Sequence, residues 1–405
     1  MPLRSSLTQC LLAAAIAMPV AFLAPTIARA DAPLTAPASA SGSAIAQAQR
    51  IADRGFDYLK TQQKPDFSWQ NSYDPPGITA IVLRAFMADE KFDADQPFLD
   101  KAFNKLLSFQ KENGGIYQDA LANYNTAIAI SALAVSKEEE YKKSIAKALE
   151  YLRSLQFSDK IEGVQPDVHV DSDASPKFGG FGYGKKGRPD LSNTQFALDA
   201  LHDAGVQPGD PAFAAAMKFA TRCQNLSETN DQKFAGDDGG FIYTDDGTEG
   251  SDPAGEYKGP DGRTLFRSYG SMTYAGLKSM IYAGLSKDDP RVKAAWAWIS
   301  KNYTVDENPG MVYAGADAAK GGLYYYYMTM SRALRAYGEP VITDANGKKH
   351  DWRIDLINKL ATLQQPDGSF VGEKRWMEDN PVLVTSYALL ALEDAKADLK
   401  ERPAK

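Results

Sequence analysis

The most regular feature of this chain is a short pattern of polar and apolar positions that recurs six times. In each copy a polar residue, usually threonine, is followed by apolar residues four and seven positions later. This spacing places the two apolar side chains on one face of a helix, so each copy predicts an amphipathic or fully buried helix. The fifth copy is degenerate at two of its three positions. The copies begin at Thr79, Thr126, Thr194, Thr273, Tyr327 and Thr385.

A second helical pattern, richer in charged residues, precedes each copy, as expected for a helix with one face in water. These segments span residues 46–62, 98–110, 141–156, 211–223, 290–302 and 352–364. Two helices in each of six units predict an all-α fold, an (α/α)6 toroid with one outer and one inner layer of helices. An open solenoid of the same units is the alternative. The closed toroid is favoured because the chain ends directly after the sixth inner helix.

The turns between the two helices of a unit also repeat. Gln110 is followed by Gly114, and Gln364 is followed by Gly368 and Phe370. We expect the glutamine to bond the last carbonyls of its helix, the glycine to adopt a turn conformation that other residues avoid, and the aromatic side chain to pack back. Residues 63–69, 179–181 and 239–241 follow the same design.

The first thirty residues have the pattern of a secretory signal peptide. Arg4 precedes a small-apolar stretch, which closes on the small-x-small residues 28–30. Two prolines interrupt this stretch, which is already short for a membrane anchor. We therefore predict export to the periplasm or the extracellular space and no transmembrane anchor in the mature chain. The predicted organisation is a signal peptide at 1–30, a flexible lead-in at 31–44, one toroid domain at 45–397 and a tail at 398–405.

Composition narrows the function classes. Of 405 residues, 44% are hydrophobic and 24% charged, which excludes a disordered chain. A net charge of −7 and the lack of a basic stripe argue against a nucleic-acid partner. Three histidines far apart in sequence give no metal-ligand spacing, and no cofactor is predicted. Cleavage of the signal peptide leaves one cysteine, Cys223, which we interpret as a buried small apolar residue.

The Gln-x3-Gly-x-aromatic turns, coupled to inner helices such as the Thr-x-x-Ala-Leu-x-Ala-Leu segment at 385–392, resemble the prenyltransferase/squalene-oxidase repeat. This family includes squalene–hopene cyclases and the β subunits of protein prenyltransferases. The resemblance covers nearly the whole mature chain. It implies an α/α toroid with an apolar central cavity.

The catalytic motifs of that family are missing. Cyclases of this type protonate their substrate with an Asp-x-Asp-Asp-Thr-Ala motif, but the matching windows at 122–127 and 190–195 keep no acid and one acid, Asp190, respectively. Zinc prenyltransferases use an Asp-x-Cys pair, and Cys223 follows Thr221-Arg222 instead. The Gly-Cys-Gly-Glu-Gln segment of thioester domains is also absent around Cys223. The sequence therefore leaves open whether the chain catalyses any reaction.

Three groups of residues remain as site candidates. Polar residues begin the inner helices, whose starts we expect to point toward one mouth of the toroid. Tyrosines and a tryptophan lie on or beside the inner helices, and they suit sugar rings or isoprenoid chains. Acid pairs at 237–238, 245–246 and 378–379 suit general acid and base roles. The ligand-binding candidates are Asn125, Asn193, Tyr274, Tyr324, Tyr327, Trp376 and Tyr387, and the candidate catalytic acids are Asp190, Asp238 and Asp379.

Two functions of different class follow from these residues. One is the binding of an apolar or isoprenoid-like ligand in an aromatic central cavity. The other is an exported glycan-active enzyme that uses paired carboxylates. A protein-interaction scaffold, which would need only the outer surface, is a third interpretation.

Overall fold

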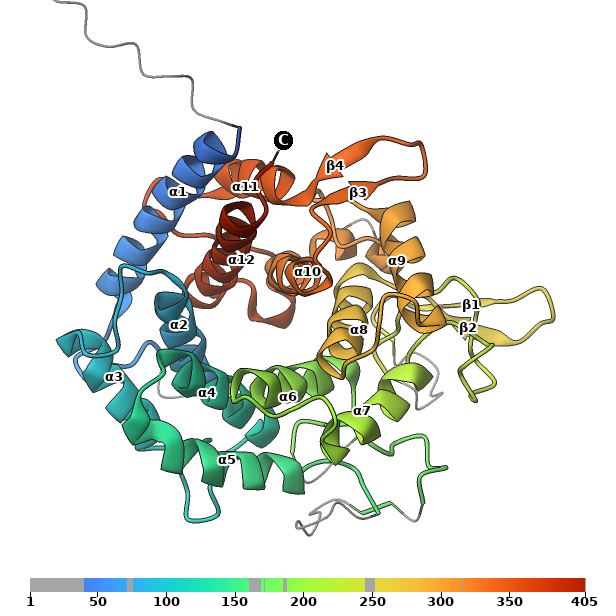
Figure 1. Cartoon of the computed structure of the whole chain (residues 1–405), viewed down its shortest axis with the longest axis horizontal. Helices are drawn as coiled ribbons and strands as arrows, with labels where there is room; N and C mark the ends of the chain where they lie inside the picture. The colour runs from blue at the N-terminus through green and yellow to red at the C-terminus, as the bar shows by residue number, and fades with distance from the viewer. Residues whose placement is uncertain are drawn as a thin grey trace, which may run out of the picture. The chain divides into compact units, whose positions relative to one another are not determined.

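The computed structural model describes residues 40–70, 76–159, 169–170, 172–184, 188–244, 252–315 and 317–404. The predicted signal peptide and the acid pair at 245–246 lie outside these residues. From residue 40 onward the chain is mostly helical, with two concentric layers of helices (Figure 1). The inner helices are α2 (Gly77–Ala88), α4 (Ala122–Ser136), α6 (Leu191–Asp203), α8 (Gly270–Tyr282), α10 (Leu323–Tyr337) and α12 (Pro381–Glu401). The outer helices are α1 (Ala40–Gln62), α3 (Pro97–Leu107), α5 (Lys142–Ser154), α7 (Pro211–Arg222), α9 (Pro290–Asn302) and α11 (Trp352–Leu363).

The inner helices form a closed circle, which confirms the toroid and rules out the open solenoid. Each inner helix packs against the next one in sequence, and α12 packs against α2. The outer layer closes as well, because α1 lies against both α11 and α12 (Figure 1). Each of the six repeat patterns begins within one inner helix.

Both ends of the toroid extend past the predicted limits. Helix α1 begins at Ala40, inside the predicted lead-in, and Ser41 and Ala44 are buried there. Helix α12 continues to Glu401, into the predicted tail, where buried Asp398 accepts a hydrogen bond from Arg353 at 2.9 Å. Tertiary burial and a long-range ion pair extend these helices, and neither was visible in the local composition.

The repeated threonine ties each inner helix to the turn that precedes it. In five of the six units its hydroxyl accepts a hydrogen bond of 2.9 to 3.1 Å from a backbone amide of that turn. In the degenerate fifth unit the tie is made in the opposite sense, since the Tyr327 hydroxyl donates to the Val305 carbonyl at 2.6 Å. The five donor–acceptor pairs are Trp69–Thr79, Ile116–Thr126, Phe181–Thr194, Phe241–Thr273 and Phe370–Thr385.

The repeated design of the turn joins neighbouring outer helices. The Gln156 side-chain amide donates to the carbonyl of Gly179 in its turn, at 2.8 Å, and to Ala212 in the next outer helix, at 2.9 Å. We expected bonds to the glutamine's own helix, and this expectation was wrong. Gly179 has φ +86°, and an added Cβ would lie 1.8 Å from the Ala215 carbonyl oxygen of that same neighbouring helix. The same glutamine bridge recurs at Gln63, Gln110, Gln224 and Gln364.

Two short antiparallel hairpins extend from the outer layer (Figure 1). Strands β1 (Glu256–Lys258) and β2 (Thr264–Phe266) precede α8, and β3 (Val341–Thr343) and β4 (Lys349–Asp351) connect α10 to α11.

Candidate functional site

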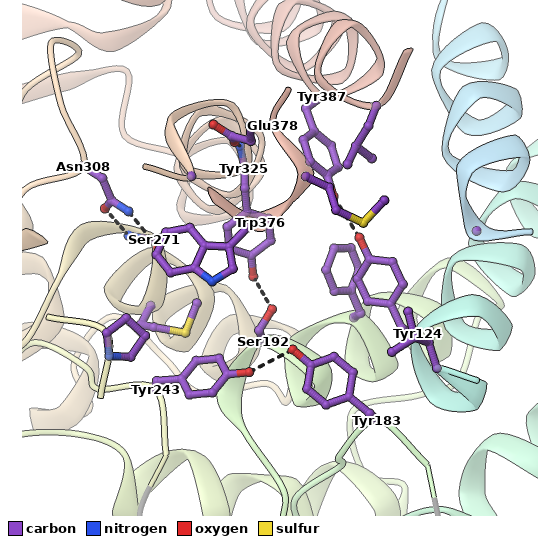
Figure 2. Close-up of a pocket in the computed structure, with 18 of the residues that line it drawn as sticks. Tyr124, Tyr183, Ser192, Tyr243, Ser271, Asn308, Tyr325, Trp376, Glu378 and Tyr387 are labelled. Atoms are coloured by element: carbon purple, nitrogen blue, oxygen red, sulfur yellow. Dashed lines mark hydrogen bonds between the residues drawn. The ribbon is translucent and has the colours of Figure 1, made fainter. Parts of the chain in front are cut away.

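The end of the toroid at which the inner helices begin holds a cavity of about 400 Å³, here called the mouth cavity (Figure 2). This volume lies in the range of about 300 to 1,000 Å³ that is typical of small-molecule sites. All six inner helices contribute a residue from their first turn. These residues are Gly77, Tyr124, Ser192, Ser271, Tyr325 and Leu383.

Each of these six residues lies two positions before the residue that begins the repeat pattern. Two residues correspond to a rotation of about 200° around an α-helix. Because the threonine hydroxyl faces the turn on the outer side, the side chain two positions earlier faces the axis of the toroid. The repeat that builds the fold therefore also selects the cavity-lining positions.

Four aromatic side chains, from α4, α6, α10 and α12, line the mouth cavity and contact one another in a circuit. They are Tyr124, Phe196, Tyr325 and Tyr387, here called the aromatic floor. Ring centroids of successive members lie 4.8 Å (Tyr124–Phe196), 6.0 Å (Phe196–Tyr325) and 6.2 Å (Tyr325–Tyr387) apart. A 2.8 Å hydrogen bond between the hydroxyls of Tyr387 and Tyr124 closes the circuit (Figure 2).

The hydroxyl groups of five cavity tyrosines are hydrogen-bonded to protein groups: Tyr124, Tyr183, Tyr243, Tyr325 and Tyr387. The Tyr325 hydroxyl bonds Ser192 at 2.9 Å, and the hydroxyls of Tyr183 and Tyr243 bond each other at 3.1 Å (Figure 2). Since these groups satisfy one another, the cavity presents mainly aromatic faces and aliphatic carbon to a ligand. This arrangement suits an apolar molecule.

Beyond the aromatic floor the axis is occupied by buried charged side chains. Asp203 of α6 pairs with Arg84 of α2, at 3.1 Å, and with Arg332 of α10. Lys278 of α8 pairs with Asp199 of α6 at 2.8 Å. We call these five residues the charge layer. Although burial opposes ionisation of Asp203, the guanidinium groups of Arg332 and Arg84 hold its pKa below the ordinary value.

One side chain connects the aromatic floor to the charge layer. The Gln195 amide donates to the Tyr325 hydroxyl at 3.1 Å, and its carbonyl oxygen accepts a hydrogen bond from Lys278. Burial lowers the pKa of Lys278, against the attraction of Asp199. The position of Tyr325 in the floor is therefore set by the charges below it.

In the part of the chain that the structure describes, Glu378 is the acid that lines the mouth cavity. One carboxylate oxygen accepts hydrogen bonds of 2.9 Å from the backbone amides of Tyr324 and Tyr325, at the start of α10. The other oxygen is buried and has no hydrogen-bond partner among the described residues. Burial raises the pKa of Glu378 to about 7, even though the backbone amides favour the charged form.

We expect Glu378→Gln to make the stability of the protein less dependent on pH. With a folded pKa of about 7 against an ordinary 4.5, the folded state holds the proton more tightly than the unfolded state. The stability that the bound proton contributes is fully present below the ordinary pKa of 4.5 and is lost as the pH rises to the folded-state pKa of about 7. The total loss is roughly 3 kcal/mol. The glutamine is neutral throughout and can still accept both backbone bonds. Between pH 4.5 and about 7, the melting temperature of the wild type should therefore fall relative to that of the variant.

The matched control is Asp379→Asn, because Asp379 is the exposed neighbour of Glu378. Its melting temperature should follow that of the wild type at every pH. The assigned environment of Glu378 would be contradicted if the difference in melting temperature between the wild type and Glu378→Gln did not change with pH.

Two further buried acids lie behind the cavity wall. Asp190 caps α6 and accepts 2.8 Å bonds from the backbone and side-chain amides of Asn193, while burial raises its pKa to about 6. Asp252 accepts a 2.8 Å bond from the Tyr243 amide, and burial raises its pKa to about 7. Both acids bind Tyr243, which lines the cavity. Asp252 bonds its backbone amide, and Asp190 accepts a hydrogen bond from its side chain.

The structure divides the candidate ligand-binding residues into two groups. Trp376 and Tyr387 line the mouth cavity. The three tyrosines Tyr274, Tyr324 and Tyr327 are buried and pack against other aromatic rings, and none of them lines the cavity. Of the run 324–327, the residue that faces the axis is Tyr325.

The two asparagine candidates are buried and bonded within the protein. The Asn125 carbonyl oxygen accepts from the Gly77 amide at 2.9 Å and so caps α2. Asn193 bonds Asp190 and accepts from the Asn123 side chain at 3.1 Å. Asn308 caps α8 in the same way, accepting from the Ser271 amide at 3.0 Å (Figure 2). Side chains of the protein thus already bond backbone amides at the starts of these helices. Asn125 and Asn193 do not line the mouth cavity.

The three candidate catalytic acids do not share a site. Asp190 is buried behind the cavity wall, Asp379 is exposed, and Asp238 lines a separate cleft on the outer side of the toroid. Asp237, which accepts a 2.6 Å bond from Ser227, and Glu307 line the same cleft as Asp238. Asp190, Asp238 and Asp379 therefore cannot act together as one acid–base pair.

Sequence reasoning missed several cavity residues. Tyr124 and Tyr325 could have been found from the repeat, because they occupy its position minus two. Tyr183 and Tyr243 lie in connecting segments, where no periodicity marks them, whereas Glu378 was identified only as part of the acid pair 378–379. Among the described residues, no three His, Cys, Asp or Glu side chains are grouped to hold a metal ion. No described helix combines the length and apolar character needed to cross a membrane.

Comparison with known proteins supports the fold. No family model matches the sequence, and no curated protein matches it. The apo structure of the type II terpene cyclase MstE from Scytonema aligns over 88% of this chain and 99% of its own, with a TM-score of 0.54 and 14% identity. A family 76 glycoside hydrolase from a bovine Bacteroides thetaiotaomicron strain aligns over 85% of this chain and 77% of its own, with a TM-score of 0.51 and 12% identity. The chain therefore has the (α/α)6 toroid fold that the resemblance implied.

Proposed function

We propose that this chain, which shares its toroid fold with a terpene cyclase, binds an apolar, isoprenoid-like small molecule in the mouth cavity. The observation that carries the proposal is the aromatic floor beneath tyrosines whose hydroxyls bond one another. An apolar chain placed there loses contact with water, which favours binding by about 25 cal/mol for each Å² buried. Aromatic faces add favourable contacts with unsaturated carbon.

The chemistry of the cavity favours binding, and we assign no reaction to it. Among the described residues one acid, Glu378, lines the mouth cavity, while the window at 190–195 lacks the central Asp of the cyclase motif. That a protein named as a type II terpene cyclase shares the fold supports an isoprenoid over other apolar ligands. The proposal includes export, which rests on residues 1–30 alone.

The test combines extraction with direct binding. We expect mass spectrometry of an organic extract of the purified, exported protein to show a stoichiometric apolar molecule. After its removal, calorimetric titration with farnesol and geranylgeraniol should show saturable binding with a negative heat-capacity change, the mark of apolar burial. A clean extract together with no saturable binding of either alcohol would contradict the proposal.

A further inference from the structure

A second concavity, here called the outer cleft, lies on the outer side of the toroid and has a volume of about 680 Å³. It is formed by the end of α9, by β1 and the segment after β2, and by residues 303–313. Unlike the mouth cavity, it is lined by charged side chains of both signs together with aromatic rings. The residues that matter below are Asp238, Tyr257, Arg267, Trp298, Lys301 and Tyr313.

One wall separates the outer cleft from the mouth cavity. Ser268 and Pro309 line the cleft, whereas their sequence neighbours Tyr269 and Asn308 line the cavity. The two segments are joined by a 2.8 Å bond from the Gly270 amide to the Pro309 carbonyl. The concavities are therefore back to back, and a ligand in one does not occupy the other.

Arg267 is held between two aromatic rings inside the cleft. Its guanidinium carbon lies 4.8 Å from the centroid of Tyr257 and 4.0 Å from that of Tyr313. In the described part of the chain, no carboxylate is paired with this guanidinium. Tyr313 is 67% exposed, so much of its ring remains open to solvent. The cleft thus offers a positioned hydrogen-bond donor beside an open aromatic face.

The cleft that holds Arg267 is also lined by a hydrogen-bond acceptor, Asp238. Asp238 is positioned by bonds from the Gly240 amide at 2.9 Å and the Ser268 hydroxyl at 2.7 Å, and also by the indole N–H of Trp298. Lys301 adds a second cation to the lining. Carboxylates accept hydrogen bonds, and guanidinium and ammonium groups donate them.

From this combination we propose that the outer cleft is a binding site for a neutral saccharide. Hydroxyl groups both donate and accept, so a saccharide in the cleft can bond both Asp238 and Arg267. The apolar face of the same ring can stack on Tyr313. A charged ligand would meet side chains of its own sign, because the lining carries both acids and bases.

Calorimetric titration with neutral tetrasaccharides of glucose and of mannose, and with a tetrasaccharide of galacturonate, tests this site. At least one neutral tetrasaccharide should bind the wild type more tightly than the galacturonate. Tyr313→Ala and Arg267→Gln should each weaken that binding at least about fivefold. Their melting temperatures should stay close to the wild-type value, because Tyr313 is exposed and Arg267 is only half-buried.

The matched control is Tyr183→Ala, which removes a tyrosine that is 48% exposed at the mouth cavity. Saccharide affinity should not change in this variant. The proposal is overturned if no neutral tetrasaccharide binds at millimolar concentration, if the galacturonate binds more tightly, or if Tyr183→Ala weakens binding as much as Tyr313→Ala. Binding of isoprenoid alcohols is measured separately, so this site and the mouth cavity succeed or fail independently.

Discussion

Asp203→Ala is expected to lower the free energy of unfolding by about 3–5 kcal/mol, because it leaves the buried Arg84 and the 19% exposed Arg332 without their carboxylate partner. The carboxylate is 5% exposed and accepts from both Arg84 and Arg332, and the Arg84 side chain is 4% exposed. Neither arginine can lose its charge in the folded protein. Chemical denaturation followed by circular dichroism gives the free energy directly.

A surface ion pair supplies the control for Asp203→Ala. Asp288 pairs with Lys293 at 3.0 Å and is 91% exposed, so Asp288→Ala should cost about 0–1 kcal/mol. Asp203→Asn retains an acceptor without the charge and should fall between the two alanine variants. If Asp203→Ala lowered the free energy of unfolding by no more than Asp288→Ala does, the charge layer would not be buried and paired as described.

The second large effect separates two aromatic residues that the sequence placed together as ligand contacts. Tyr327→Ala should lower the free energy of unfolding by about 3–5 kcal/mol, because it empties a fully buried position. It also removes the 2.6 Å bond to Val305 that replaces the threonine tie in the fifth unit. Trp376→Ala removes a side chain that is 46% exposed, so its stability should change by less than about 1 kcal/mol.

The same two variants should behave in the opposite way toward a ligand. Because Trp376 lines the mouth cavity, Trp376→Ala should weaken farnesol binding about tenfold, while Tyr327→Ala, measured below its melting temperature, should retain affinity. Val341→Ala, which shortens a 41% exposed side chain on the distant β3–β4 hairpin, is the control for Trp376. Unchanged affinity in Trp376→Ala would remove this residue from the site.

Export and the nature of the bound molecule remain predictions that rest on residues 1–30 and on the character of the cavity. The toroid fold itself is shared with a terpene cyclase and a glycoside hydrolase. The separation of an apolar mouth cavity from a polar outer cleft makes each assignment testable by itself.

The repeat pattern determined the two-layered array of helix pairs, because a helix that buries one face at regular spacing can bury that face only against its neighbours. The packing of α12 against α2 decided that the array closes into a toroid. The repeat also determined which positions face the axis. A residue two positions before the repeated threonine lies about 200° around the helix from it, and this rotation follows from helix geometry alone. This rule predicts from the sequence that Tyr325 faces the axis, whereas the prediction of Tyr324 and Tyr327 did not take into account which side of the helix the repeated position faces.

The tertiary structure alone decided which groups meet. Asp203 joins Arg84 across 119 residues and Arg332 across 129, and no local signal records such distances along the chain. Trp376 and Glu378 reach the mouth cavity from the segment between α11 and α12, where backbone geometry and not periodicity directs the side chains: Trp376 has φ +57°. Of two adjacent acids, Glu378 is buried and Asp379 exposed, because the amides at the start of α10 bind one carboxylate and leave the other in water.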